Sequence, residues 1–151
     1  MKKLIILISA FSLGFGFYAK AQYIGAQDLP ADINQDFSAK YPNLTKVDWE
    51  KDGKHFKATF TVEKWAHELV YDQNGKVVSQ QFGLPVSSLP TGIFSGIKKN
   101  FPELQVQEAN QIEEKGYVSY QLSLKDENNA VEKVVMAADG RVIRTVTEDQ
   151  Q

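Results

Sequence analysis

Hydrophobic residues recur at every fourth position in two short stretches of the chain. This spacing lines one side of an α-helix. The stretches lie sixty residues apart and share the same pattern, with Ile33, Phe37 and Tyr41 in the first and Ile93, Ile97 and Phe101 in the second. The pattern predicts two short amphipathic helices, each of about three turns.

Prolines mark both ends of each predicted helix. Pro30 and Pro90 stand in the first turn, where the missing backbone N–H costs no hydrogen bond. Pro42 and Pro102 directly follow the last aromatic residue, and a proline disfavours helical backbone in the residue before it. We therefore expect each helix to end before its second proline.

Strict alternation of apolar and polar residues follows the first helix. It predicts an antiparallel hairpin of residues 55–62 and 65–71. With a turn at Glu63-Lys64, the apolar side pairs Val62 with Trp65, Phe60 with His67, Ala58 with Leu69, and Phe56 with Tyr71. A slip of one residue would turn polar side chains toward the core, so the pattern specifies the register. Because Glu-Lys is not a favoured two-residue turn, a longer turn stays open as an alternative.

The second copy repeats this arrangement. Residues 118–124 alternate, and residues 134–138 supply the return strand across a polar loop. Turn dipeptides, Asn-Gly in the first copy and Asp-Gly in the second, introduce another strand in each. The additional strands are expected at 76–82 and 141–147, and before each hairpin near 46–50 and 105–113.

The sequence therefore contains an internal duplication. Residues 29–33 (LPADI) recur as residues 89–93 (LPTGI), ahead of matching helix and strand patterns. Since one side of each sheet is apolar and each copy has one amphipathic helix, a two-layer packing is favoured. We predict an α+β fold of two tandem helix-plus-antiparallel-sheet repeats, with the sheets side by side and the helices packed on one face. The expected division is a signal peptide at 1–21, repeat 1 at 22–83, a linker at 84–88 and repeat 2 at 89–151.

The N-terminus has the features of an export signal. Lys2 and Lys3 precede an apolar stretch at 4–17, and Ala19-Lys20-Ala21 fits signal peptidase, so cleavage is expected before Gln22. The rival hypothesis is an uncleaved anchor, although the stretch is shorter than the ~20 residues of a spanning helix. Cleavage removes three lysines and changes the formal charge from −2 to −5.

Composition narrows the possible chemistry. The chain has 151 residues, of which 42% are hydrophobic and 24% charged, as in an ordinary globular protein. The absence of cysteine excludes disulfides, thiol nucleophiles and Cys-zinc sites, and no basic excess indicates nucleic-acid binding. His55 and His67 have opposite parity in the hairpin, so they cannot share a metal there. We expect no enzyme, no cofactor and no metal.

The side of the sheet opposite the predicted core is the candidate binding surface. Tyr117, Val70 and Val135 place apolar groups among polar neighbours there, as on surfaces that bind proteins. An ordinary solvated face with scattered apolar residues is the alternative. The candidate partner-binding residues are Lys57, Thr59, Glu68, Val70, Tyr117, Ser119, Gln121, Lys133 and Val135.

Several of these patterns together resemble a known family. They are the aromatic-proline pairs at 41–42 and 101–102, the strands after them, and the turn sequences at 70–75 and 137–140. The chain resembles, from Leu29 to about Val146, the PepSY-like family of beta-lactamase-inhibitor-like proteins exported by bacteria. The resemblance implies two sheets forming one curved surface, whose concave side grips the target enzyme in the inhibitor relatives. It also implies that peptidases are targets of such domains.

We therefore expect a non-catalytic exported binding module, periplasmic or secreted, that presents its sheet face to a protein partner such as an envelope enzyme or peptidase. Tyr117 would be the anchor, and no nucleic acid or membrane would be bound after signal cleavage. The alternative is a protein that binds a small ligand or envelope polymer in an aromatic cleft between the repeats, near Trp49 and Trp65. An enzyme built on His55 and His67 is a third hypothesis.

Overall fold

The computed structural model describes residues 22–146, and the predicted signal peptide lies outside the described residues. The helices are α1 (Ala31–Lys40) and α2 (Thr91–Asn100), each preceded by a short 3-10 helix, η1 (Ala26–Asp28) and η2 (Val86–Ser88). The strands are β1 (Gln22–Ile24), β2 (Val47–Asp52), β3 (His55–Val62), β4 (Trp65–Tyr71), β5 (Val77–Leu84), β6 (Gln105–Glu114), β7 (Tyr117–Lys125), β8 (Val131–Ala137) and β9 (Val142–Val146). No helix among these residues is long and apolar enough to cross a membrane.

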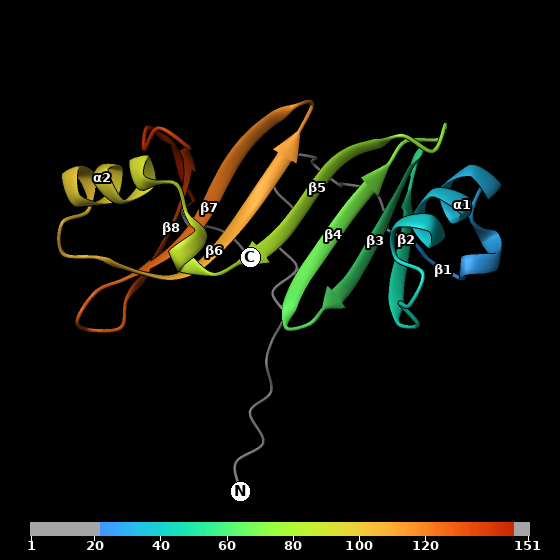
Figure 1. Ribbon diagram of the computed structural model, residues 1–151, viewed down its shortest axis with the longest axis horizontal. Coiled ribbons are helices and arrows are strands. Elements are labelled where there is room, and N and C mark those ends of the chain that lie inside the picture. The colour runs from blue at the N-terminus through green and yellow to red at the C-terminus, as the bar shows by residue number, and fades with distance from the viewer. Residues whose placement is uncertain (1–21, 147–151) are drawn as a thin grey trace, which may run out of the picture.

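All of the strands belong to one antiparallel sheet in which spatial order follows chain order from β1 to β9 (Figure 1). The predicted α+β architecture with two repeats is confirmed. The expected linker is partly strand, because β5 continues to Leu84 and pairs with β6, with Leu84 opposite Ala109. This pairing joins the two repeats into a single sheet.

The register predicted for the first hairpin is confirmed at every pair, from Phe56 opposite Tyr71 to Val62 opposite Trp65. The alternative of a longer turn is wrong. Glu63 takes a positive φ of 56°, so the hairpin closes through two residues although neither is a glycine. The alternation of apolar and polar residues along β3 and β4 stabilises this register by more than the modest conformational free energy that the left-handed backbone of Glu63 costs.

Each helix packs its apolar stripe into one of two hydrophobic clusters. In the first repeat, Ile33 and Phe37 of α1 are buried. They pack with side chains of β2, β3 and β4, namely Trp49, Phe56, Ala58, Phe60, Leu69 and Tyr71. In the second repeat, Ile93 and Ile97 of α2 are buried with Leu89, Ala109, Tyr120, Leu122, Leu124, Val134 and Met136.

Strand pairing shows that both clusters use the same side of the sheet. His67, two residues before Leu69 of the first cluster, is opposite Phe82. Phe82 is opposite Gln111, which in turn is opposite Tyr120 of the second cluster. We call this side the cluster face, and the side formed by the alternate residues the polar face.

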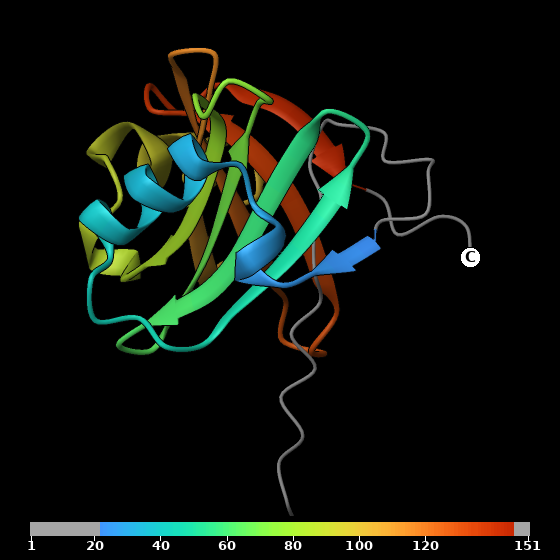
Figure 2. The same ribbon diagram turned by 90° about the vertical axis from the view of Figure 1, so that its right-hand side faces the viewer.

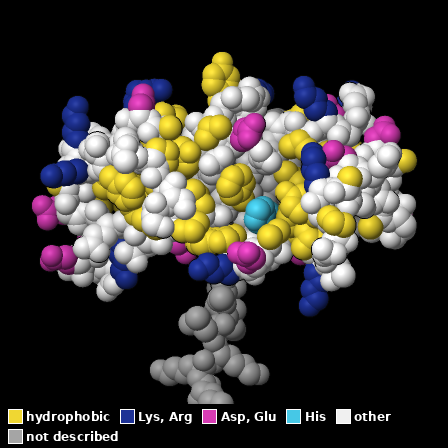
Figure 3. Space-filling model, viewed as in Figure 1, with side chains coloured by type: hydrophobic (Ala, Val, Ile, Leu, Met, Phe, Trp, Pro, Cys, Tyr) yellow, Lys and Arg dark blue, Asp and Glu magenta, His cyan; other side chains and the backbone are white. Residues whose placement is uncertain are grey.

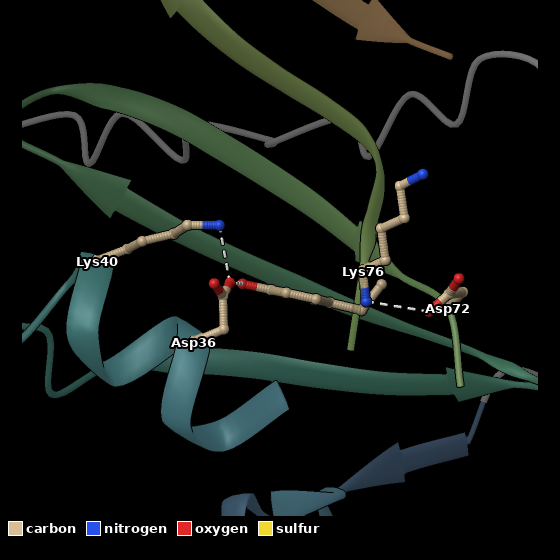
Figure 4. Close-up of polar contacts among 5 residues, drawn as sticks. Asp36, Lys40, Asp72 and Lys76 are labelled. Atoms are coloured by element: carbon tan, nitrogen blue, oxygen red, sulfur yellow. Dashed lines mark hydrogen bonds and ion pairs between the residues drawn. The ribbon is translucent and has the colours of Figure 1, made fainter. Parts of the chain in front are cut away.

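The two helices are attached to the sheet in chemically different ways. In the first repeat, the hydroxyl of the buried Tyr71 donates to Asp36 at 2.9 Å, and Lys40 bonds to the same carboxylate oxygen at 2.8 Å (Figure 4). Sixty residues later, the position of Asp36 is occupied by Gly96, whose missing side chain lets α2 approach the β8–β9 turn at Gly140. The two helices therefore share one sequence pattern, but a polar contact attaches α1 to the sheet and close backbone packing attaches α2.

Candidate functional site

The predicted partner-binding residues all belong to the polar face, although they differ in exposure. Register places Lys57 opposite Val70, and Gln121 opposite Val135. Tyr117 is 81% exposed at the beginning of β7. The half-buried members are Lys57, Thr59, Glu68, Ser119 and Lys133, and the buried members are Val70, Gln121 and Val135.

Three charged side chains interact on the first half of the polar face. Lys57 forms an ion pair with Glu50 across the β2–β3 pair at 2.7 Å, and both side chains are mostly covered. Burial raises the pKa of Glu68, the positive charge of Lys57 opposes this, and the negative charge of Glu50 adds to it. Two carboxylates therefore compete for one ammonium, and the surroundings favour an additional cation.

A buried centre lies on the second half of the polar face. Ile112, Gln121 and Val135 are 7%, 4% and 4% exposed, and Gln121 is flanked by Asn110 and Val135 on the neighbouring strands. The side-chain carbonyl oxygen of Gln121 has no hydrogen-bond partner among the described residues. An unpaired buried acceptor costs free energy of about 1–3 kcal/mol, so this group requires an explanation.

Ile112 is part of this centre but was not among the predicted partner-binding residues. It lies opposite Ser119, which is one of the predicted partner-binding residues. The pattern of β6 is mostly polar, with Glu, Gln and Asn on both sides of Ile112, so no alternation indicated its face. Only the pairing of β6 with β7 reveals its position.

The two histidines lie on opposite faces, as predicted. His67 is on the cluster face, stacked between Phe60 and Phe82 with ring centroids at 5.3 and 5.7 Å. His55 lies opposite Asp52 at the start of β3. Among residues 22–146, no group of three His, Asp or Glu side chains is arranged to hold a metal ion.

The stacked position of His67 leads to a prediction about pH. Burial lowers its pKa from the ordinary value of 6.5, so the unfolded chain takes up a proton first as pH falls. We expect the free energy of unfolding to decrease between pH 7.5 and pH 5.5, and this decrease to shrink in His67→Asn. Urea denaturation at both values measures it, with His55→Asn as the matched control. An unchanged pH dependence in His67→Asn would contradict the assignment.

The two tryptophans do not form the aromatic cleft that the alternative hypothesis requires. Trp49 is buried in the first cluster, where its ring makes an edge contact with Phe37. Trp65 packs against Gly83 and lies beneath the ammonium of Lys64. Because the two indole rings make separate contacts, Trp49 and Trp65 do not line a common cleft between the repeats.

Solved structures with the same fold come from Bacteroides. A DUF2874 family protein from Bacteroides uniformis aligns with a TM-score of 0.65 at 18% identity, over 78% of this chain and 88% of its own. A BLIP-like protein from Bacteroides fragilis aligns with a TM-score of 0.61 at 16% identity, over 82% and 92%. A protein described as "putative periplasmic" from Bacteroides eggerthii aligns with a TM-score of 0.65 at 15% identity, over 78% and 87%. Identities this low establish likeness of fold alone.

Curated proteins give no match to this chain. A family model, in contrast, matches two adjacent segments, residues 17–79 and 77–143, in agreement with the internal duplication. Together these segments span most of the sequence. The chain therefore belongs to the PepSY-like family, whose model is described as "Putative beta-lactamase-inhibitor-like, PepSY-like".

Proposed function

We propose that this protein is a non-catalytic exported module that binds a protein partner on the polar face of its sheet. We infer that α1 and α2 both cover the cluster face, because both hydrophobic clusters use it and the two helices lie to one side of the sheet in Figure 2. On this inference, neither helix of residues 22–146 covers the polar face, which leaves its exposed and half-buried residues available to a partner.

The unpaired carbonyl oxygen of Gln121 is the observation that carries this proposal. It is buried beside Val135 and Ile112, in surroundings that resemble the centre of an interface more than a solvated sheet. A partner that moves the neighbouring side chains aside and inserts an N–H donor would satisfy this acceptor. The binding energy would then include recovery of the cost of the unpaired group.

Electrostatics supports a basic group on the partner. Glu68 and Glu50 share the single positive charge of Lys57, so a partner cation near Glu68 would relieve their repulsion. Such complementarity mainly increases the association rate and the specificity. The words "beta-lactamase-inhibitor-like" in the family description support an enzyme as the partner, and we propose an envelope enzyme or peptidase.

Location and organisation form part of the same proposal. Residues 1–21 would be removed on export, leaving repeat 1 at 22–83, a connection at 84–88 and repeat 2 at 89–151. The mature protein would act in the periplasm or outside the cell. The relative described as "putative periplasmic" supports the first of these locations.

Tyr117 provides the most direct test, because its side chain is 81% exposed and its loss leaves the core intact. If Tyr117 anchors the partner, Tyr117→Ala weakens binding by about 2 kcal/mol, roughly thirtyfold in Kd. The measurement uses residues 22–151 immobilised for binding and inhibition assays against a panel of purified class A β-lactamases and envelope peptidases. The melting temperature of the variant is expected to match the wild type.

Phe94→Ala is the matched control, since it removes another exposed aromatic ring from helix α2, away from the polar face. We expect it to bind like the wild type. A partner that binds Tyr117→Ala and the wild type equally would show that this end of the polar face is not the interface. Equal loss of binding in both variants would mean that the effect of Tyr117→Ala is not specific to the polar face, which would contradict the proposal.

A further inference from the structure

A groove runs along β5, at the junction of the two repeats. Two cavities form it, with volumes of about 700 and 150 Å³, and both are lined by Gln80. The larger volume falls within the range of natural small-molecule sites. In Figure 3, which has the same view as Figure 1, hydrophobic side chains gather over the middle of the molecule, between the helices.

The larger cavity is lined by three lysines from different elements. Lys40 ends α1, Lys76 precedes β5, and Lys115 lies in the turn between β6 and β7. Lys40 bonds to Asp36 and Lys115 lies 3.7 Å from Glu114, so a bound anion would share these ammonium groups with carboxylates. Figure 4 shows the ammonium of Lys40 on Asp36, and the side chain of Lys76 extending away from that contact while its backbone N–H bonds to Asp72. This end of the groove suits an oxyanion.

Neutral polar groups and one carboxylate line the same cavity. Gln80 donates to Glu113 at 2.6 Å, across the strand pair that joins the repeats. Ser79 also lines the cavity. A carboxylate next to lysines disfavours a simple inorganic anion, whereas it accepts hydrogen bonds from hydroxyl groups. The lining therefore fits a molecule that carries both hydroxyls and a negative charge.

The smaller cavity adds an aromatic wall to the groove. It is lined by Tyr41, His67 and Phe82, together with Glu68, Leu69, Gln80 and Gln81. Phe82 and His67 stack with 19° between their ring planes, so together they form an aromatic wall of this cavity. Aromatic walls pack against the C–H groups of sugar rings, while sugar hydroxyls bond to side-chain amides and carboxylates.

We propose that this groove binds an anionic saccharide. A sugar ring would lie against the wall formed by Phe82 and His67, its hydroxyls would meet Gln80 and Glu113, and its carboxylate or phosphate would lie among the lysines. The site uses residues of both repeats, and Glu68 is the one residue that it shares with the predicted partner-binding residues. Binding of a protein partner and of a saccharide can therefore be lost independently.

Isothermal titration calorimetry of residues 22–151 with trigalacturonate tests this proposal. Maltotriose serves as the neutral saccharide, and citrate as an anion without sugar rings. We expect trigalacturonate to bind, and maltotriose and citrate to bind at least about tenfold more weakly. Maltotriose lacks the negative charge, and citrate lacks the sugar rings. The double variant Lys76→Ala, Lys115→Ala should weaken trigalacturonate binding about tenfold, the effect of losing two partly exposed ion pairs.

Lys98→Ala, Lys99→Ala is the matched control, because it removes the same charge from α2, outside this groove. Phe82→Leu keeps an apolar side chain but removes the flat ring, and it should also weaken trigalacturonate binding. Failure of trigalacturonate to bind, equal affinity for citrate, or equal weakening by the control pair would overturn the proposal.

Discussion

Replacing Gly96 by valine is expected to lower the free energy of unfolding by about 3 kcal/mol, the upper range for overfilling a packed site. A Cβ at this position would lie 2.6 Å from Cε of Met136 and would strike the carbonyl oxygen of Gly140. Since that carbonyl belongs to backbone, it cannot move aside as a flexible side chain can. Helix α2 would have to shift away from the β8–β9 turn and open the second cluster.

Thermal unfolding followed by circular dichroism measures this effect, and a decrease of about 10 °C in Tm is expected for a domain of this size. Ser95→Val is the control, because it introduces the same β-branched residue on the exposed side of α2. We expect that variant to lose only the small difference in helix propensity. Equal losses at both positions would mean that propensity, and not the approach to Gly140, causes the destabilisation.

Replacing Gln121 by glutamate is expected to lower the free energy of unfolding at pH 7.5 by about 3 kcal/mol, the cost of an uncompensated buried charge. Gln121 is 4% exposed, and register places it between Asn110 and Val135, two uncharged residues. Burial should raise the pKa of the new carboxyl. The loss should therefore diminish as pH falls and the carboxyl becomes protonated, a comparison that urea denaturation at pH 7.5 and 4.5 provides.

Gln121→Met reverses the sign of this effect. Methionine has a similar volume and no carbonyl, so it removes the unpaired acceptor, and we expect a gain of about 1 kcal/mol in stability. The same variant should bind the protein partner more weakly, because the partner's donor loses its acceptor. For the glutamate variant, the control is Gln107→Glu, which adds the same charge at an exposed position of β6. A methionine variant that is less stable than the wild type would show that the amide is already satisfied.

Local patterns determined a large part of this fold. The apolar stripe ending at Phe37 and Phe101 fixes each helix because only an α-helix brings every fourth residue to one side. The alternation in β3 and β4 fixes their register because a slip of one residue reverses every side chain. These features follow from neighbours in the chain, and for this reason they were predictable.

Contacts between distant segments were decided by tertiary structure. The pairing of β5 with β6 joins the repeats, yet nothing in the glycine- and proline-containing segment after Phe82 indicated that the strand continues. Which residue fills the space under each helix also depends on the partner strand. Asp36 meets Tyr71, whereas Gly96 meets Gly140, although the two helices share one sequence pattern.

The candidate sites also combine features that the sequence predicts with features that only the tertiary structure decides. Parity along each strand was enough to assign Lys57, Tyr117 and Gln121 to the face opposite the core. Burial of Gln121 beside Ile112 required the order of β6, β7 and β8 within the sheet. The groove along β5 required three lysines from separate elements to converge. Sequence thus determined which side of a strand a residue occupies, and only the tertiary structure decided which residues meet there, because strand order and helix approach are properties of the whole chain.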